Sequence, residues 1–460
     1  MKTLFRKATA IVFAFSLIIA GTNTVSVGAT EVKAEQTADD EFLKNVIGEY
    51  VPLFEGATFE TKYDHYWHDY TSAVIGESMA EYAVSMMKKA IGAATYGDQA
   101  TSDFFCGYAN DVTKVEFGEP DGTEVTFTLK DGSTVKHTYE FVKMADASGA
   151  TEAGQQMNMN GYLYKSKDGN TDDFAYLFMC PDTPATTYHL EFRWGDTEEN
   201  ILKLTDGKYK NWLAAGFSAE ALTDPNETLL QQVIALFVIE NVSSMSGDEA
   251  NLQRLPITGK WDMDVTPFKS MSGYENASMY MELSKNGEGK SYVDMAGSGK
   301  YNLASTYNFF VYDTNANDGK DAGIYLVQSD EGVKTSTFEI SETEGKTALV
   351  FNSSEGVLTF YYNSPFTPAK VTLSKVAASG SKKLKATWKE VPDADGYKVM
   401  VSTTKKFKKS KTVSVKGKTS ATVKKLSKKK YFVKVCAYIL DRTGKKVYGK
   451  YSAVKRVKIK

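Results

Sequence analysis

The feature that most constrains the fold is a series of short β-prone runs between residues 255 and 363. Asn-Gly, Asp-Gly and Ser-Glu-Gly sequences separate several of these runs, and such turns join neighbouring antiparallel strands. Strands are expected at 278–283, 291–294, 306–312, 323–328, 334–340, 347–352 and 357–362. With the opening Gly259-Lys260-Trp261, they predict seven or eight antiparallel strands in a small barrel.

Residues 367–460 have a second strand pattern, in which apolar and polar residues alternate over several short runs. This alternation predicts a sandwich of two sheets. The pattern comprises Trp388, Asp395-Gly396-Tyr397, Leu426, Tyr431-x-Val433-x-Val435 and Tyr448-Gly449-x-Tyr451-Ser452. It resembles a bacterial fibronectin type III domain. The Gly-x-Trp that opens the preceding block, which we delimit as residues 255–363, resembles the start of lipocalin-like domains, whose barrel can be a packed core or can hold a ligand.

Charge is distributed unevenly along the chain. From residue 368 onward there are 28 Lys and Arg against four Asp and Glu, whereas the whole chain has 55 and 57. Such a basic tail favours an anionic partner, although lysines also keep a surface soluble. We do not expect nucleic acid outside the cell. An anionic cell-wall polymer is therefore the expected partner of this tail, with a lipid headgroup as the other anionic choice.

The first residues have the form of a secretory signal peptide. A basic stretch from Lys2 to Lys7 precedes an apolar run over 10–20, and Val27-Gly28-Ala29 provides a small-residue cleavage site. Residues 1–29 are therefore excluded from the expected fold. No later apolar run approaches the roughly 20 residues that span a bilayer. We expect a secreted chain, extracellular or associated with the cell surface, without a transmembrane segment after cleavage.

The stretch His189-Leu190-Glu191-Phe192-Arg193-Trp194-Gly195 carries the strongest chemical signal. Alternation along a strand places His189 and Glu191 on one face. The upstream turn Cys180-Pro181-Asp182 could supply a third donor, because zinc accepts imidazole nitrogen, thiolate sulfur and carboxylate oxygen. The sequence therefore predicts a metal site that contains His189, Glu191 and Asp182.

Residues 39–246 begin with helical sequence through Gly48-Glu49-Tyr50, have further helical sequence over 72–94 and 226–241, and are strand-rich between these last two segments. In this order, the string Gly107-Tyr108-Ala109-Asn110-Asp111-Val112 and the histidine strand look like the ZinT family of bacterial extracytoplasmic zinc-binding proteins. The resemblance implies a calycin-type barrel with helices at one end. It also implies that His189 and Glu191 project into one mouth of that barrel.

The resemblance to the ZinT family implies zinc binding by three histidines. One of them lies in an Asp-His turn, and two form a His-x-His pair on a strand. His189 matches the first histidine of the pair, and Glu191 replaces the second. The turn falls at Cys180-Pro181-Asp182, which has no histidine. Exchange of imidazole for carboxylate shifts preference towards harder ions. Zinc is therefore the expected metal, and manganese is the alternative.

Other residues offer weaker signals. His65 and His68 are three apart and would share a helical face, with Asp64 and Asp69 able to orient them. His137 is predicted to be an ordinary strand residue. Cysteine offers two further possibilities: Cys106 and Cys180 could form a disulfide, and Cys436 is expected to be a buried small hydrophobe.

Taken together, the patterns predict a mainly β chain with three domains after the signal peptide. These are a calycin- or lipocalin-like barrel with added helices, a second small antiparallel barrel and a C-terminal β-sandwich. The predicted function is zinc binding or zinc acquisition at the cell surface. The alternative is a surface adhesion or ligand-binding protein with a vestigial metal site. Catalysis is not expected, because the chain has neither a Gly-x-Ser-x-Gly nor a His-Glu-x-x-His motif.

Overall fold

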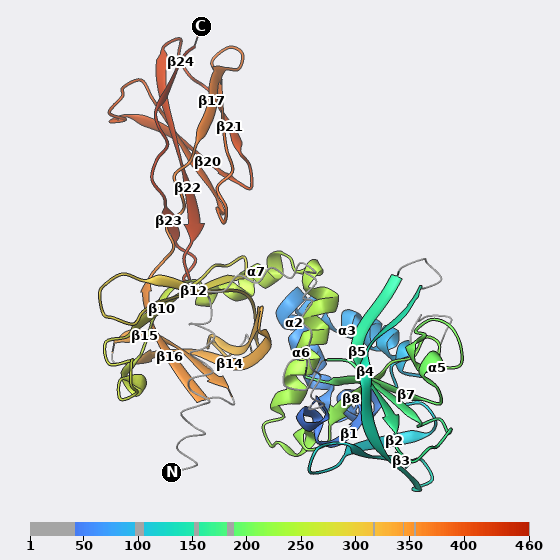
Figure 1. Cartoon of the computed structure of the whole chain (residues 1–460). Helices are drawn as coiled ribbons and strands as arrows, with labels where there is room; N and C mark the ends of the chain where they lie inside the picture. The colour runs from blue at the N-terminus through green and yellow to red at the C-terminus, as the bar shows by residue number, and fades with distance from the viewer. Residues whose placement is uncertain are drawn as a thin grey trace. The chain divides into compact units, whose positions relative to one another are not determined.

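The computed structural model describes residues 42–96, 105–150, 156–181, 188–315, 318–343, 345–353 and 356–459. Strands dominate, in two closed barrels and two smaller sheets (Figure 1), so the predicted fold class is confirmed. The chain forms two compact units. Among the described residues, one unit contains those up to Gly247 together with Ile324–Ser336, and the other contains those from Asp248 to Gly323 and from Thr337 onward. The predicted signal peptide lies outside the described residues, and the three domain boundaries stay predictions.

The first barrel is an antiparallel meander in which each strand pairs with the next and the last closes on the first. The closing pair aligns Tyr50 with Ser218. The helical sequence predicted through Gly48-Glu49-Tyr50 is therefore wrong at its end, because these residues pair within the barrel as strand β1. Its strands are β1 (Gly48–Pro52), β2 (Val112–Phe117), β3 (Glu124–Leu129), β4 (Thr134–Ala150), β5 (Gln156–Ser166), β6 (Tyr176–Met179), β7 (Leu190–Gly195) and β8 (Ala214–Ser218).

Aromatic and aliphatic side chains fill the interior of this barrel. Trp194 lies at its centre, with ring centroids 5.4 Å from Phe127 and 4.8 Å from Trp212. The alternation of apolar and polar residues explains the barrel, because every second side chain of a strand faces the same side. The interior is therefore a packed core.

Helices accompany the first barrel (Figure 1). The helix predicted over 72–94 exists, but it begins earlier and is divided into α2 (Asp64–Ile75) and α3 (Glu77–Tyr96). Gly76 separates them with a φ of 89°, which breaks the helix because only glycine adopts that region readily. Two further helices are α5 (Glu198–Leu202) and α6 (Thr228–Val242).

Among the described residues, one helical stretch, Thr228–Met245, is long and apolar enough to cross a membrane, with a mean hydropathy of 1.3. The sequence predicts a helix over 226–241 and no membrane-spanning segment there. In the structure, the helix packs against α2. Tyr66 Oη donates to Glu227 Oε2 at 2.6 Å, and Tyr70 Oη donates to Gln231 Oε1 at 2.8 Å. A buried core helix of a globular fold has the same composition.

The second barrel also has eight antiparallel strands, as its turn-punctuated sequence predicts. β9 pairs with both β10 and β16 and so closes the barrel. Trp261 is fully buried, and its indole N–H donates to the Ile257 carbonyl at 2.8 Å. The strands are β9 (Gly259–Met263), β10 (Ser278–Leu283), β11 (Glu288–Asp294), β12 (Asn302–Asp313), β13 (Ala322–Ser329), β14 (Gly332–Thr343), β15 (Lys346–Ser353) and β16 (Gly356–Ser364).

The C-terminal segment folds as the predicted sandwich. One sheet has the order β17, β18, β21, and the other has β20, β19, β22, β23, with β24 also paired to β22. The strands are β17 (Leu373–Ala378), β18 (Leu384–Trp388), β19 (Gly396–Ser402), β20 (Ser410–Lys416), β21 (Ser420–Val423), β22 (Lys430–Leu440), β23 (Lys446–Tyr448) and β24 (Lys455–Lys458).

Packing in the sandwich agrees with the sequence pattern. Trp388 and Tyr397 are buried, with ring centroids 5.2 Å apart. Tyr431, at the start of β22, accepts a hydrogen bond from the Ser427 backbone N–H at 3.0 Å, a corner found in immunoglobulin-like sandwiches. Cys436 is fully buried, so the prediction of a small core residue is confirmed.

The remaining helical elements are short. They are α7 (Asp248–Arg254) and the turns η1 (Phe42–Val46), η2 (Phe54–Thr58), η3 (Thr61–Tyr63), η4 (Ala221–Thr223), η5 (Ser243–Met245), η6 (Leu255–Ile257) and η7 (Thr266–Phe268).

Candidate functional site

The two faces of strand β7 have different roles: one packs into the barrel core, and the other carries a candidate ligand. Leu190, Phe192 and Trp194 belong to the core of the first barrel and are fully buried. Because side chains alternate, Glu191 faces the opposite side, away from that core, and His189, which precedes the strand, contacts Glu191 on that side. The expectation that the two share a face is therefore confirmed. The expectation that they project into a barrel mouth is wrong, because the same alternation turns them to the outer surface of the wall.

His189 and Glu191 contact each other directly. The Nε2 atom of His189 lies 3.2 Å from Oε1 of Glu191. The two side chains are 13% and 29% exposed, so water reaches them only in part. In a tetrahedral zinc site with metal–ligand distances of about 2.0–2.1 Å, two ligand atoms lie about 3.3 Å apart. The observed separation of 3.2 Å is close to one edge of such a site.

The turn before β7 sets the direction of His189. Tyr188 is buried and has a φ of 66°, the left-handed region that an aromatic residue rarely adopts. Holding a residue there costs of the order of 1–3 kcal/mol, and such strain gathers at functional sites. Tyr188 directly precedes His189, so its backbone conformation affects the direction in which the His189 imidazole points.

His189 and Glu191 line a pocket with a volume of about 570 Å³. Leu53, which follows β1, and Phe54 of η2 form one part of the wall. Ile91 of α3 and Phe237 of α6 add further apolar surface, and the Phe237 ring lies 6.2 Å from the His189 ring. The pocket thus lies between the outer face of the barrel wall and the helices of the same unit.

Two further donors line this pocket, and sequence reasoning missed both. Glu240 follows Phe237 by three residues on α6, which brings both to one helix face. Partial burial raises the pKa of Glu240, while nearby His189 opposes that shift. Cys106 lies beside β8, where its carbonyl accepts the Ala215 N–H at 3.0 Å. A lone carboxylate in an apolar helix was the signal that could have identified Glu240.

The predicted third ligand, Asp182, lies outside the described residues. Its neighbour Cys180 is buried and packs with Leu163 and Phe178. Within the described residues, no three His, Cys, Asp or Glu side chains converge closely enough to hold a metal ion. The structure therefore brings together two of the three predicted ligands and adds two donors around them, without a closed ligand shell.

The cysteines do not form the disulfide that the sequence left open. Cys106 and Cys180 are both thiols. Cys106 is partly exposed in the pocket, whereas Cys180 and Cys436 are buried. Cys106 is therefore able to act as a sulfur donor and is the most accessible thiol of the three.

The helical histidines have other contacts. His65 and His68 lie on α2 as predicted. His65 Nδ1 lies 2.9 Å from the Lys62 carbonyl oxygen, and His68 Nδ1 lies 3.5 Å from Asp69. Asp64 pairs with Lys88 instead of orienting a histidine. These contacts favour a structural role for α2.

His137 is more embedded than the sequence suggested. Its side chain is 2% exposed, with Nδ1 3.1 Å from Asp168 Oδ2 and Nε2 3.1 Å from Asp172 Oδ2. Hydrogen bonds from His137 and from the Thr138 N–H lower the pKa of Asp168. This cluster holds the loop between β5 and β6 against β4.

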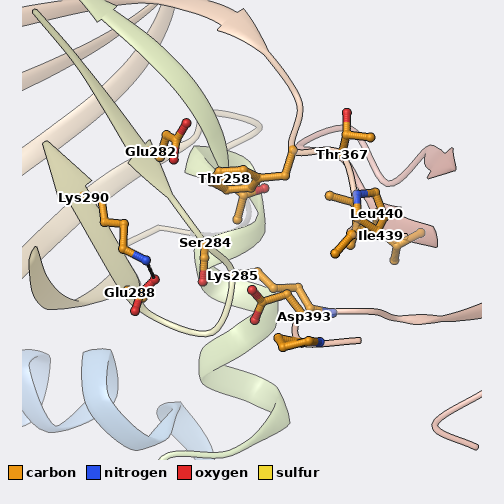
Figure 2. A pocket seen from close by; sticks show the side chains of 14 residues that line it. Thr258, Glu282, Ser284, Lys285, Glu288, Lys290, Thr367, Asp393, Ile439 and Leu440 are labelled. Atoms are coloured by element: carbon orange, nitrogen blue, oxygen red, sulfur yellow. Dashed lines mark hydrogen bonds and ion pairs between the residues drawn. The ribbon is translucent and has the colours of Figure 1, made fainter. Parts of the chain in front are cut away.

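A second pocket, of about 280 Å³, lies in the other unit. Figure 2 shows Glu288 and Lys290 pointing towards each other on its wall, joined as an ion pair. Lys285 pairs with Asp395, which is only 12% exposed. Burial raises the pKa of Asp393, which also lines the pocket. Because both lysines are already paired with acids, this pocket presents a weaker candidate site.

Comparisons with known proteins give partial likenesses. No protein-family model and no curated protein sequence matches the chain. It is similar to a Fn3-like protein from Clostridium thermocellum, at 25% identity and a TM-score of 0.17, over 20% of this chain and 94% of that one. It is also similar to the FN5 domain of Drosophila Lar, at 24% identity and a TM-score of 0.17, over 20% of this chain and 96% of that one. Zn(II)-bound AdcA from Streptococcus pneumoniae matches at 16% identity and a TM-score of 0.25, over 45% of this chain and 40% of AdcA. These likenesses do not confirm the expected ZinT-type calycin family.

Proposed function

We propose that this protein binds a divalent metal ion, zinc first, at His189 and Glu191. The observation that carries the proposal is the 3.2 Å separation of the imidazole nitrogen and the carboxylate oxygen. That separation places both atoms within reach of a single ion. Cys106 and Glu240 line the same pocket, but they do not converge with the pair in the described structure, so each side chain would have to reorient to join the ligand set. Asp182 remains a candidate from the sequence.

The donor chemistry suits zinc. One nitrogen, one sulfur and two carboxylates form a mixed set that zinc accepts, and thiolate disfavours hard ions. Without Cys106, the remaining set would move towards manganese. Bound metal would act here as cargo or as a structural ion. The proposal is one of binding rather than catalysis.

The proposed location of the protein rests on its sequence. We propose that the mature chain is secreted and works outside the cell or at its surface, because its first residues have the form of a signal peptide. We also propose that the basic C-terminal domain retains the protein near an anionic cell-wall polymer. Its 28 basic residues against four acidic ones support this retention.

Calorimetric titration of the full mature chain with zinc and with manganese tests the metal proposal. We expect one zinc site whose affinity falls by at least about 100-fold in His189→Ala, because the variant loses the imidazole donor of the pair. His68→Ala removes another histidine of the same unit and serves as the matched control. Equal affinity in His189→Ala and the unaltered chain would contradict the proposal.

Cys106 provides an independent readout. The other two cysteines are buried, so alkylation of the folded protein should modify Cys106 first. We expect zinc to slow this alkylation in the unaltered chain and not in His189→Ala. Zinc protection that persists in the variant would place the metal elsewhere.

The same pocket supports a second candidate function. Its volume of about 570 Å³ and its apolar wall resemble small-molecule sites, in which a few polar groups orient a mostly apolar ligand. A surface or ligand-binding protein that retains only a vestigial metal site would use the pocket in this way. Titration with anilinonaphthalene sulfonate tests this reading. Probe binding lost in Phe237→Arg but unaffected by zinc would favour it over metal binding.

A further inference from the structure

We propose that one end of the C-terminal sandwich is a docking surface for a linear polymer of phosphodiester charges. This inference rests on the proposed retention by an anionic polymer and goes further by locating the contact. We name this end the lysine tip. It consists of the lysines in three loops: Lys382, Lys383, Lys405, Lys406, Lys408, Lys409, Lys424, Lys425, Lys428 and Lys429.

Strand register brings the three loops to one end. Leu384 pairs with Val423, so the turn between β17 and β18 lies beside the loop that follows β21. Ser402 pairs with both Ser410 and Phe432, so the loop between β19 and β20 lies beside the start of β22. All three lysine loops are therefore neighbours, although they are far apart in sequence.

Hydrogen bonds tie these loops together. The Leu426 N–H donates to the Lys382 carbonyl at 3.0 Å. Lys411 Nζ donates to the Lys424 carbonyl at 2.6 Å. β24 also reaches this end, where Lys458 pairs with Lys430 and adds two more basic residues (Figure 1). The loops that carry the lysines are thus held together by hydrogen bonds and strand pairing.

The acidic residues of the sandwich lie at the other end. Glu390, Asp393 and Asp395 precede β19, and Asp441 follows β22. Gly396 pairs with Tyr438, so these two loops meet. The Leu440 N–H donates to Asp395 Oδ2 at 2.7 Å, which confirms their proximity. The domain is therefore electrically polarised rather than evenly basic.

Described carboxylates do not neutralise the charge of the lysine tip. All ten lysines are exposed. In the part of the chain that the structure describes, no ion pair joins any of them to a carboxylate, whereas Lys208 pairs with both Asp173 and Asp196. Crowded like charges repel and weaken a fold, and an anionic ligand relieves that repulsion. The tip therefore fits a partner with many closely spaced negative charges.

The residue types of the lysine tip favour an anionic polymer over a lipid bilayer as its binding partner. Attachment to a bilayer usually combines basic residues with exposed apolar side chains. Within the described tip, Leu426 is buried and Phe407 is half-buried, with Lys434 Nζ 4.5 Å from its ring centroid. Lysine presents a point charge rather than the planar fork of arginine, which suits flexible phosphate groups in many orientations.

Binding of the full mature chain to poly(glycerol phosphate) tests the inference. The tip variant replaces Lys405, Lys406, Lys408 and Lys409 by glutamine. The control variant replaces Lys389, Lys416, Lys418 and Lys445, which are exposed outside the tip, and it loses the same charge. At about 50 mM salt, we expect at least a tenfold loss of affinity in the tip variant, since each lysine near an anionic surface contributes roughly 1 kcal/mol. We expect less than about a threefold loss in the control.

The outcomes separate the two levels of the proposal. If the unaltered chain binds neither the polymer nor phosphatidylglycerol vesicles at low salt, both the retention and the lysine tip are overturned. Equal losses in the two variants would overturn the tip alone and leave retention by net charge. Tip-dependent binding to phosphatidylglycerol vesicles without binding to the polymer would overturn the choice of partner. Circular dichroism of both variants checks that the exposed substitutions leave the fold intact.

Discussion

The two barrels share an architecture and differ in what surrounds their walls. Both are closed, antiparallel and built from eight strands, and both bury a tryptophan in their interior. In the first barrel, helices leave an apolar pocket around His189 and Glu191. The pocket beside the second barrel instead has lysines that are paired with acids. The two barrels thus share a scaffold, and the residues outside the barrel wall determine which donors line each pocket.

This difference explains why the first barrel is the better candidate for binding. A histidine and a glutamate under a partly apolar cover are shielded from water, which strengthens their interaction with an ion. Exposed ion pairs such as Glu288 with Lys290 contribute little to the free energy of unfolding. The Glu288 carboxylate is also already paired with a lysine, so it is a poorer ligand for a metal ion. The predictions below test the contrast between the barrels, from the largest expected effect to the smallest.

The largest effect is expected from the central tryptophans. Trp194→Ala and Trp261→Ala should each destabilise their own barrel by about 3–5 kcal/mol, because each removes a buried aromatic side chain and leaves a cavity. Differential scanning calorimetry should show that each variant lowers a different unfolding transition. Trp→Phe at each position provides the control with a smaller loss. A uniform shift of all transitions would show that the barrels unfold together.

Acid should act on the first barrel through Asp168, with an effect smaller than the loss of a tryptophan. The pKa of Asp168 is lowered in the folded state, so its ionised form stabilises the fold above the ordinary value of 3.8. That contribution is lost as the pH falls through the folded-state pKa. Asp168→Asn should therefore lower the urea midpoint at about pH 7 and have little effect at about pH 2. A difference that does not depend on pH would contradict the ionic role.

Glu240 should couple stability to binding in the opposite direction. Partial burial raises its pKa, so the ionised form is disfavoured in the folded protein and stability falls as the pH rises through that pKa. Because solvent screens this half-exposed group, Glu240→Gln should stabilise the metal-free protein at neutral pH by only a few tenths of a kcal/mol. Zinc affinity should fall by about tenfold. Unchanged zinc affinity would remove Glu240 from the ligand set.

The smallest effect is expected beside the second barrel. Lys290→Gln breaks the pair with Glu288, in which the two side chains are 34% and 53% exposed. Chemical denaturation should reveal a loss of at most about 1 kcal/mol, and zinc titration should show no change. A larger loss would mean that this ion pair organises the second pocket, which would narrow the contrast between the two barrels.

Local sequence determined most strands and turns of the second barrel and the sandwich. The run at 278–283 coincides with β10, and those at 347–352 and 357–362 fall within β15 and β16. Alternation with period two and glycine turns are properties of adjacent residues, so they can be read before the chain folds. The same rule correctly placed His189 and Glu191 on one face.

What only the tertiary structure decided is which face of β7 is the inner one and what covers the other. His189 and Glu191 turn outward because Leu190, Phe192 and Trp194 fill the barrel. Glu240 joins them from α6, and Cys106 joins them from beside β8. The lysine tip likewise gathers three loops through strand pairing. Such contacts depend on chain closure over long sequence separations, and no local pattern encodes them.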